Sequence, residues 1–164
     1  MKATRFFLDT AYILALLNPN DIYHKKARAI LSAMHSAREV CITEAVLIEI
    51  GNALSRSNRI AATAFINSCY STPNVKVVSV DTSLLKRALD FYNNREDKEW
   101  GLTDCVSFIV MIDQDLKEAL TSDEHFQQAG FKTRVTTGLN SCNGWYGNES
   151  QKIVLDRIDR IRFW

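Results

Sequence analysis

Four acidic residues that lie far apart in the sequence each stand where an apolar run meets a turn or a helix. They are Asp9, Glu49, Asp104 and Asp123. If the fold gathers them, two of these charges about 4 Å apart repel each other by roughly 4 kcal/mol, and this repulsion must be neutralised. Hard divalent cations prefer oxygen ligands of this kind. The four residues therefore indicate a site for Mg²⁺ or Mn²⁺.

Each position also has a purely structural explanation. Asp9 could cap the helix that follows it, Asp104 could interact with the positive end of its helix, and residues 121–124 contain a Thr-x-x-Glu capping box. Glu49 is harder to explain in this way, because a carboxylate in mid-helix beside an apolar stripe gains nothing from capping and needs a partner. Glu44, one turn earlier, is better interpreted as a first-turn residue that interacts with the helix dipole.

Short β-branched or aromatic runs alternate with amphipathic segments along the chain, which predicts a parallel sheet covered by helices on both faces. Ligands of such sheets collect at the carboxyl ends of the strands, and Asp9 follows the first of them. We expect strands at residues 6–8, 40–42, 75–80, 118–120 and 132–135. We expect helices at residues 11–17, 21–37, 44–57, 59–71, 82–94, 103–113 and 124–129.

Length and composition are those of an ordinary globular protein. The chain has 164 residues, of which 46% are hydrophobic and 24% charged, and its formal net charge is +1. One domain with a real core is expected at this size. A strongly basic balance is absent, so any nucleic-acid surface must come from local clusters such as residues 25–28, 56–59 and 86–87. Taken alone, each cluster is better explained as a solvated helix face.

Cysteine usage and hydropathy favour a cytoplasmic protein. The four cysteines are widely spaced, without a Cys-x-x-Cys pair, so we expect neither a zinc site nor a disulfide. Asp9 interrupts the apolar stretch near the N-terminus, and this argues against a signal peptide. No apolar segment approaches the roughly 20 residues that a membrane-spanning helix needs, so we expect no contact with a membrane.

The composition changes after Thr136. A Gly-, Asn- and Ser-containing stretch is followed by a segment in which Val154, Ile158 and Ile161 share one helical face. We expect residues 136–164 to form a linker and a C-terminal helix, and residues 1–135 to form the main domain. The helix could pack on that domain, contact a partner or touch RNA.

Four segments together resemble the motifs of the PIN-domain nucleases, and among these the VapC-like ribonuclease toxins of type II toxin–antitoxin pairs. Each motif is weak alone, but their order and separations are suitable. The similarity spans Phe6 to about Val135. The segments are Phe7 to Tyr12, Thr43 to Leu54, Leu102 to Cys105, and Leu120 to Phe126 with Ala129 to Phe131.

The resemblance implies a three-layer α/β/α fold with a central parallel sheet. It also implies an Mg²⁺- or Mn²⁺-dependent endoribonuclease, often a homodimer, with a cognate antitoxin as a further partner. Carried over to this sequence, the acidic quartet consists of Asp9, Glu49, Asp104 and Asp123, with hydroxyl support from Thr10 or Ser122. Residues 136–164 depart from the family pattern, so neither their role nor the usual dimer surface follows from the resemblance.

A bound divalent ion can supply both a nucleophilic water and charge stabilisation for phosphodiester hydrolysis. We therefore expect RNA cleavage that leaves 5′-phosphate and 3′-hydroxyl ends, with one metal or two. A phosphohydrolase that uses Asp9 as a nucleophile is a weaker alternative, because Ala11 stands where such enzymes usually carry a second aspartate. Another alternative is a non-catalytic RNA-binding or protein-docking module on the same fold.

The substrate does not follow from the sequence. Structured RNA, messenger RNA and a DNA flap are all compatible with the motifs, because RNA reading depends on loops and stacking aromatic residues. Trp100 could stack on a base or belong to the edge of the core. His125 could donate to a phosphate or lie at the surface.

Overall fold

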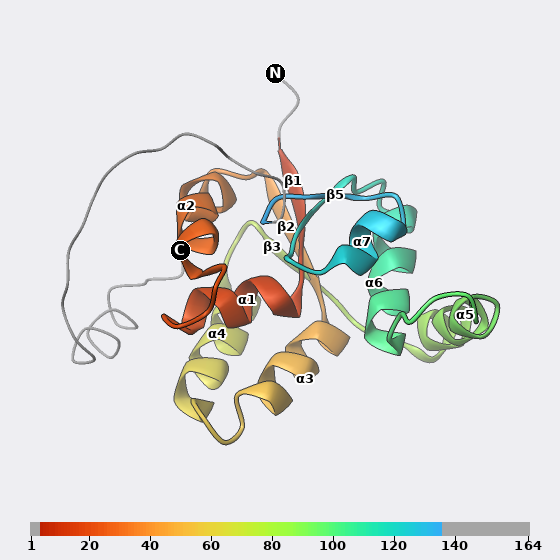
Figure 1. The fold of residues 1–164 in the computed structure, drawn as a ribbon, viewed down its shortest axis with the longest axis horizontal. Helices are drawn as coiled ribbons and strands as arrows, with labels where there is room; N and C mark the ends of the chain where they lie inside the picture. The colour runs from red at the N-terminus through yellow and green to blue at the C-terminus, as the bar shows by residue number, and fades with distance from the viewer. Residues whose placement is uncertain (1–3, 136–164) are drawn as a thin grey trace.

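The computed structural model describes residues 4–135, which form one parallel sheet and the helices that cover it (Figure 1). The strands are β1 (Arg5–Leu8), β2 (Glu39–Thr43), β3 (Val75–Val78), β4 (Glu118–Leu120) and β5 (Lys132–Thr133). The helices are α1 (Thr10–Leu17), α2 (His24–His35), α3 (Glu44–Ala53), α4 (Arg59–Ser71), α5 (Thr82–Asn93), α6 (Leu102–Asp113) and α7 (Glu124–Gln128).

The sheet has the strand order β3-β2-β1-β4-β5, and every neighbouring pair is parallel. The chain builds outward from β1 to β3 on one side and then returns to place β4 on the other side of β1. Strand order therefore reverses between β1 and β4. In open parallel sheets this reversal opens a crevice beyond the carboxyl ends of the strands, where ligands bind.

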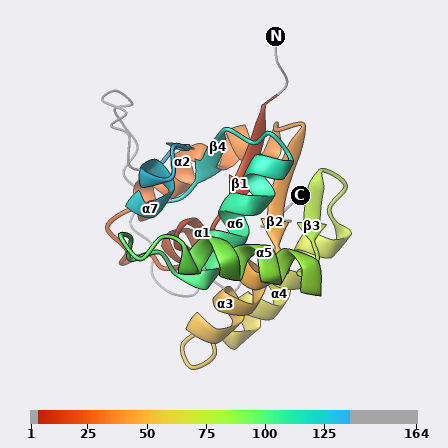
Figure 2. The ribbon, with the colours of Figure 1, turned by 90° about the vertical axis from the view of Figure 1, so that its right-hand side faces the viewer.

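Helices cover both faces of the sheet, as Figures 1 and 2 show from two directions. The helices α5, α6 and α7 lie on one face, and α1, α2 and α4 lie on the other. Helix α3 begins directly after β2 and contacts α1, α4 and α6 beyond the carboxyl ends of the strands. The predicted three-layer α/β/α architecture is confirmed.

Aromatic rings fill the layer between the sheet and helices α6 and α7. Phe108 packs edge-on against Phe126 and Trp100, with ring centroids 5.0 and 5.1 Å apart, and Phe126 in turn lies 6.0 Å from Phe7 of β1. Trp100 is only 4% exposed and also stacks on Phe91. Of its two interpretations, the structure therefore supports a core residue, since the ring is already covered on its faces by protein.

The predicted helices and strands are present, with shorter ends in several cases. The segment expected to be helical from residue 21 begins its helix at His24, because the Asp21 carboxylate accepts a hydrogen bond from the Tyr23 N–H and forms a turn there. The helix expected to reach residue 57 ends at Ala53. Thr43 and Asp81 are the N-caps of α3 and α5, since their side chains accept hydrogen bonds from backbone N–H groups in the first turns of these helices.

Some expectations concern residues that the structure does not describe. The predicted linker and C-terminal helix at residues 136–164, and with them Cys142, lie outside residues 4–135. The other three cysteines are buried free thiols. None of the helices formed by the described residues has the length and apolar content that a bilayer span requires.

Candidate metal centre

Asp9 stands at the carboxyl end of β1 and begins α1. Its Oδ2 accepts hydrogen bonds from the Ala11 N–H at 3.2 Å and from the Thr121 hydroxyl at 2.7 Å. The residue is only 5% exposed. Burial raises the pKa of Asp9 from 3.8 to about 7, and the negative charge of Asp104 adds to the shift, although the hydrogen bonds from Thr121 and the backbone oppose it. Asp9 thus caps α1 and is also a buried carboxyl group whose charged form is disfavoured by its surroundings.

Thr121 is a member of this site that the sequence reasoning did not name. It follows β4, the strand beside β1, and is completely buried. Its hydroxyl donates to Asp9 and accepts from the Asp123 N–H at 2.9 Å. The sequence shows a polar residue after an expected strand, but the contact with Asp9 follows only from the pairing of β4 with β1. The role of Ser122 stays a prediction, since the hydroxyl beside Asp9 belongs to its neighbour.

Asp104 lies in the first turn of α6, close enough to Asp9 for its charge to act on that carboxyl group. The Gly101 N–H donates to its Oδ2 at 2.9 Å. Burial raises the pKa of Asp104, and the nearby charge of Asp123 raises it further, while the hydrogen bonds from Gly101 and His125 lower it. The charge of Asp104 raises the pKa of Asp9, and the charge of Asp123 raises the pKa of Asp104. The three aspartates are therefore close enough to interact electrostatically.

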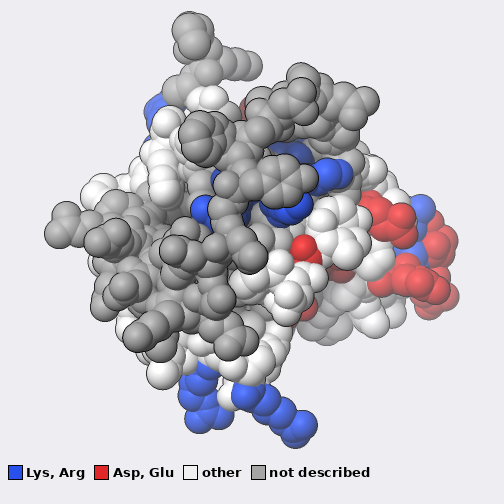
Figure 3. All heavy atoms as spheres, turned by 60° about the vertical axis from the view of Figure 1, so that its left-hand side comes forward, with Lys and Arg blue, Asp and Glu red and all other residues white. Residues whose placement is uncertain are grey.

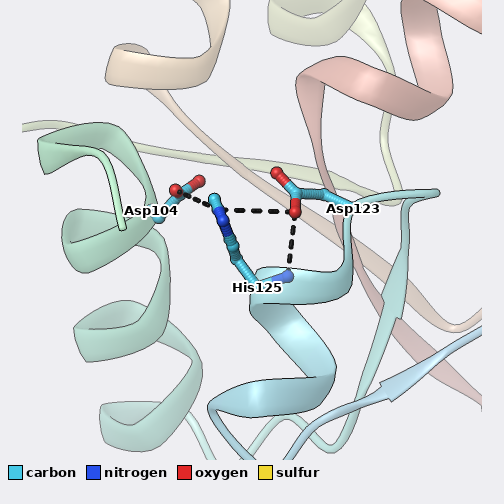
Figure 4. A group of neighbouring side chains, drawn as sticks. All are labelled: Asp104, Asp123 and His125. Atoms are coloured by element: carbon cyan, nitrogen blue, oxygen red, sulfur yellow. Dashed lines mark hydrogen bonds and ion pairs between the residues drawn. The ribbon is translucent and has the colours of Figure 1, made fainter. Parts of the chain in front are cut away.

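Asp123 and His125 stand at the start of α7, facing Asp104 (Figure 4). The Asp123 carboxylate caps the helix by accepting the His125 N–H at 2.8 Å. The His125 ring nitrogen Nδ1 lies 3.2 Å from Asp104 Oδ2 and 3.4 Å from Asp123 Oδ1. Helix α7 therefore holds a carboxylate and an imidazole against the carboxylate of α6.

Glu49 reaches the site through Thr10. The Thr10 hydroxyl, next to Asp9 in the chain, donates to Glu49 Oε2 at 2.8 Å. Glu44 is accounted for elsewhere, because its carboxylate accepts the Val80 N–H at 3.1 Å and contacts the Tyr70 hydroxyl at 3.4 Å. This difference separates the two glutamates of α3: Glu49 accepts a hydrogen bond from the residue next to Asp9, and Glu44 ties α3 to the residues after β3.

The four predicted acidic residues thus come from α3 and from the starts of α1, α6 and α7 to one end of the sheet. Within residues 4–135, no Lys or Arg side chain forms an ion pair with any of them. Asp9 is buried, Asp104 and Asp123 are half-buried, and Glu49 is exposed. A buried carboxylate such as that of Asp9 is costly unless it is neutralised. Oxygen donors with one imidazole nitrogen are a ligand set that divalent metals accept, so the residues present fit such an ion.

Basic side chains do not form one continuous stripe on the described part of the face in Figure 3. They gather in separate groups, and acidic and basic side chains lie together at its right-hand edge. This distribution agrees with the net charge of +1. Attraction of a polyanion to this face would depend on local groups of Lys and Arg rather than on a general positive field.

A parallel sheet with this strand order and acidic residues beyond the carboxyl ends of β1 and β4 agrees with the family comparison: the chain belongs to the PIN domain family, which matches residues 6–132. The chain is also 26% identical over 125 residues to the 23S rRNA-specific endonuclease VapC20 of Mycobacterium tuberculosis, in strains H37Rv and CDC 1551 / Oshkosh. This match covers 76% of the present chain and 94% of the relative.

The crystal structure of VapC20, described as a sarcin-ricin loop cleaving toxin, has a similar fold. It superposes with a TM-score of 0.70 at 26% identity, over 78% of this chain and 96% of VapC20. The family expectation from the four motifs is therefore confirmed, and the present protein is a distant homologue of that endonuclease.

Proposed function

We propose that this protein is an endoribonuclease that depends on a divalent metal, Mg²⁺ or Mn²⁺, and hydrolyses phosphodiester bonds in RNA. The observation that carries the proposal is the group of acidic residues at one end of the sheet. Asp104 and Asp123 offer ligand atoms within 4.8 Å of each other, and the charge of Asp104 acts on Asp9, which is buried with its pKa raised to about 7. Glu49 is linked to them through the hydroxyl of Thr10, beside Asp9. Membership of the PIN domain family and the distant similarity to an rRNA endonuclease support it.

The proposed ligands are the carboxylates of Asp9, Asp104, Asp123 and Glu49. A divalent ion held there would supply a nucleophilic water at neutral pH and charge stabilisation on the phosphate. The chain prepares the site through groups that hold these carboxylates in place: the Thr121 hydroxyl orients Asp9, the Thr10 hydroxyl orients Glu49, and the Gly101 amide orients Asp104. Such supporting contacts fix ligand orientation before the substrate arrives.

We further propose that the protein acts as the toxin of a toxin–antitoxin pair in the cytoplasm. The support is its similarity to VapC20, whose crystal structure is described as that of a toxin. A cognate antitoxin that covers the acidic crevice, and a homodimer, are the corresponding partners. Growth arrest on expression that disappears with Asp104→Asn, and relief by the product of an adjacent small open reading frame, would test this role.

The direct test is RNA cleavage by the wild type and by two matched variants of helix α6. Asp104→Asn changes the residue at the crevice, whereas Asp113→Asn changes the far end of the same helix, where Asp113 pairs with Arg87 at 2.7 Å. The substrates are labelled single-stranded RNA and a stem-loop of 23S rRNA, each with Mg²⁺, with Mn²⁺ and with a chelator.

We expect cleavage that requires the metal and leaves 5′-phosphate ends. Asp104→Asn should lower the rate about 100-fold or more, while Asp113→Asn should remain near the wild type. Equal cleavage by the wild type and Asp104→Asn would disprove the assignment. RNA binding without any cleavage in either metal would instead support a non-catalytic RNA-binding module.

A further inference from the structure

The imidazole of His125 lies between two of the proposed metal ligands. It comes from the first turn of α7, and its Nδ1 atom is directed at the gap between Asp104 and Asp123 (Figure 4). One ligand atom from each of these residues lies within 4.8 Å of the other two. The side chains are 25%, 16% and 32% exposed for His125, Asp104 and Asp123, so solvent reaches the group without surrounding it.

The spacing of these atoms suits a shared ion. In an octahedral site with metal–ligand bonds of about 2.1 Å, adjacent ligand atoms lie about 3 Å apart. His125 Nδ1 is 3.2 Å from Asp104 Oδ2 and 3.4 Å from Asp123 Oδ1. Only a small adjustment of the side chains would place all three atoms on one ion.

The backbone also holds the imidazole in this position. Asp123 Oδ1, which lies 3.4 Å from Nδ1, accepts the His125 N–H at 2.8 Å, so the ring and the carboxylate are fixed in the same turn of α7. Asp104 is fixed independently by the Gly101 amide on the opposite helix. The two sides of the gap are therefore preorganised, which favours a defined ligand set over a mobile surface histidine.

We propose that His125 is a nitrogen ligand of the metal centre, and that it makes the site select a first-row transition metal such as Mn²⁺ over Mg²⁺. This inference rests on the proposed metal-dependent function. Mg²⁺ takes oxygen ligands almost exclusively, whereas imidazole suits transition metals. A ligating Nδ1 carries no proton, so the neutral ring holds its proton on Nε2. The rival arrangement is an imidazole that only donates a hydrogen bond to the carboxylates.

Pulsed electron paramagnetic resonance of Mn²⁺ bound to the untagged full chain distinguishes these arrangements. A directly bound imidazole adds ¹⁴N modulation to the Mn²⁺ spin echo, and labelling of histidine alone with ¹⁵N changes that modulation. The chain has three histidines, which makes single substitutions practical. His125→Asn keeps a hydrogen-bond donor near the position of Nδ1 but removes the imidazole. His35→Asn is the matched control, because His35 ends α2 at the opposite end of the sheet.

We expect histidine-derived modulation in the wild type and in His35→Asn, and its loss in His125→Asn. Calorimetric titration should show Mn²⁺ affinity reduced about tenfold or more by His125→Asn, while Mg²⁺ affinity changes by less than about threefold. Circular dichroism would verify that the variant folds. If it does not fold, the response of the wild type to ¹⁵N-histidine still decides the question.

Two results would overturn the inference, and they differ in what they mean for the enzyme. Mn²⁺ that binds tightly at Asp104, but without histidine modulation, would remove His125 from the ligand set and leave the proposed ribonuclease intact. Failure of the wild type to bind either Mn²⁺ or Mg²⁺ would overturn both the ligand assignment and the metal-dependent function.

Discussion

Charged residues are arranged differently at the two ends of the β-sheet. At the amino ends, Arg5 and Glu39 are register partners on β1 and β2, and the Arg5 guanidinium contacts the Glu39 carboxylate at 2.5 Å. The same guanidinium donates to the Gln114 carbonyl at 2.9 Å, which fixes the end of α6. At the carboxyl ends, acidic residues face one another, and no Lys or Arg side chain in residues 4–135 pairs with them.

Helix α6 connects these two environments. Its first turn carries Asp104 at the acidic crevice, and Gln114 caps its other end beside Arg5. Among residues 4–135, one end of the sheet therefore pairs its charges, whereas the other gathers carboxylates that no Lys or Arg side chain pairs with. The comparison predicts that substitutions at the acidic end change activity and pH dependence, and that substitutions at the amino end change stability alone.

The largest expected effect is a fall in stability of the metal-free protein as the pH rises. The pKa of Asp9 is about 7 in the folded protein, compared with 3.8 without the fold. Between about pH 4 and pH 7 the folded state therefore holds more protons than the unfolded state, and raising the pH favours unfolding. The loss should approach about 4 kcal/mol above pH 7, and the raised pKa of Asp104 acts in the same direction.

Denaturant unfolding with a chelator at about pH 5 and about pH 8 measures the larger part of this effect, roughly 2 to 3 kcal/mol. Asp9→Asn should flatten most of the dependence, since an amide does not titrate, and it should abolish metal-dependent cleavage. Adding Mn²⁺ to the wild type at the higher pH should recover stability, because an ion that binds only the folded state stabilises it. Equal pH slopes for the wild type and Asp9→Asn would show that Asp9 does not cause the pH dependence of stability.

The two glutamates of α3 provide the next test. Glu49→Gln removes a proposed ligand and should lower metal-dependent cleavage about 100-fold, with little change in stability. Glu44→Gln is the matched control on the same helix, where the carboxylate contacts the Val80 amide and Tyr70 instead. It should keep its cleavage rate and lose about 1 kcal/mol of stability. The opposite pattern would show that Glu44, and not Glu49, is the metal ligand of α3.

Much of this fold could be predicted because its strands and helices differ in their apolar periodicity. The alternation of strands and helices indicated a parallel sheet, and the position of Asp9 after β1 placed the site at the carboxyl end. Helix ends were less predictable, since they depend on single contacts such as the Asp21 turn before α2. Nothing in the periodicity reveals such a side-chain hydrogen bond.

The site was only partly predictable for a different reason. The acidic residues stand out by their type, but their supporting groups are ordinary residues that matter only through strand order. Thr121 contacts Asp9 because β4 lies beside β1, and a sequence does not specify that neighbour. His125 is similar, because its contact with Asp104 depends on how α7 packs near α6.

Thr121 allows a smaller test of the acidic end. Thr121→Val keeps the shape of the side chain but removes the hydroxyl that joins Asp9 to the Asp123 amide. We expect a loss of about 1 to 3 kcal/mol in stability, because the buried Asp9 carboxylate and the half-buried Asp123 N–H lose their partner, and a decrease of about tenfold in cleavage. Thr121→Ser should restore both properties. Normal cleavage by a destabilised Thr121→Val would limit the hydroxyl to a structural role.

The smallest expected effect concerns the amino end, where Arg5→Met removes the ion pair and the hydrogen bond to Gln114. The Arg5 and Glu39 side chains are 30% and 28% exposed, so solvent screening limits the loss in the free energy of unfolding to about 1 kcal/mol. A double-mutant cycle with Glu39→Gln isolates the pair itself. Metal affinity and cleavage rate should not change. If Arg5→Met weakens Mn²⁺ binding, then the two ends are coupled through α6, and the division between a stabilising end and a reactive end does not hold.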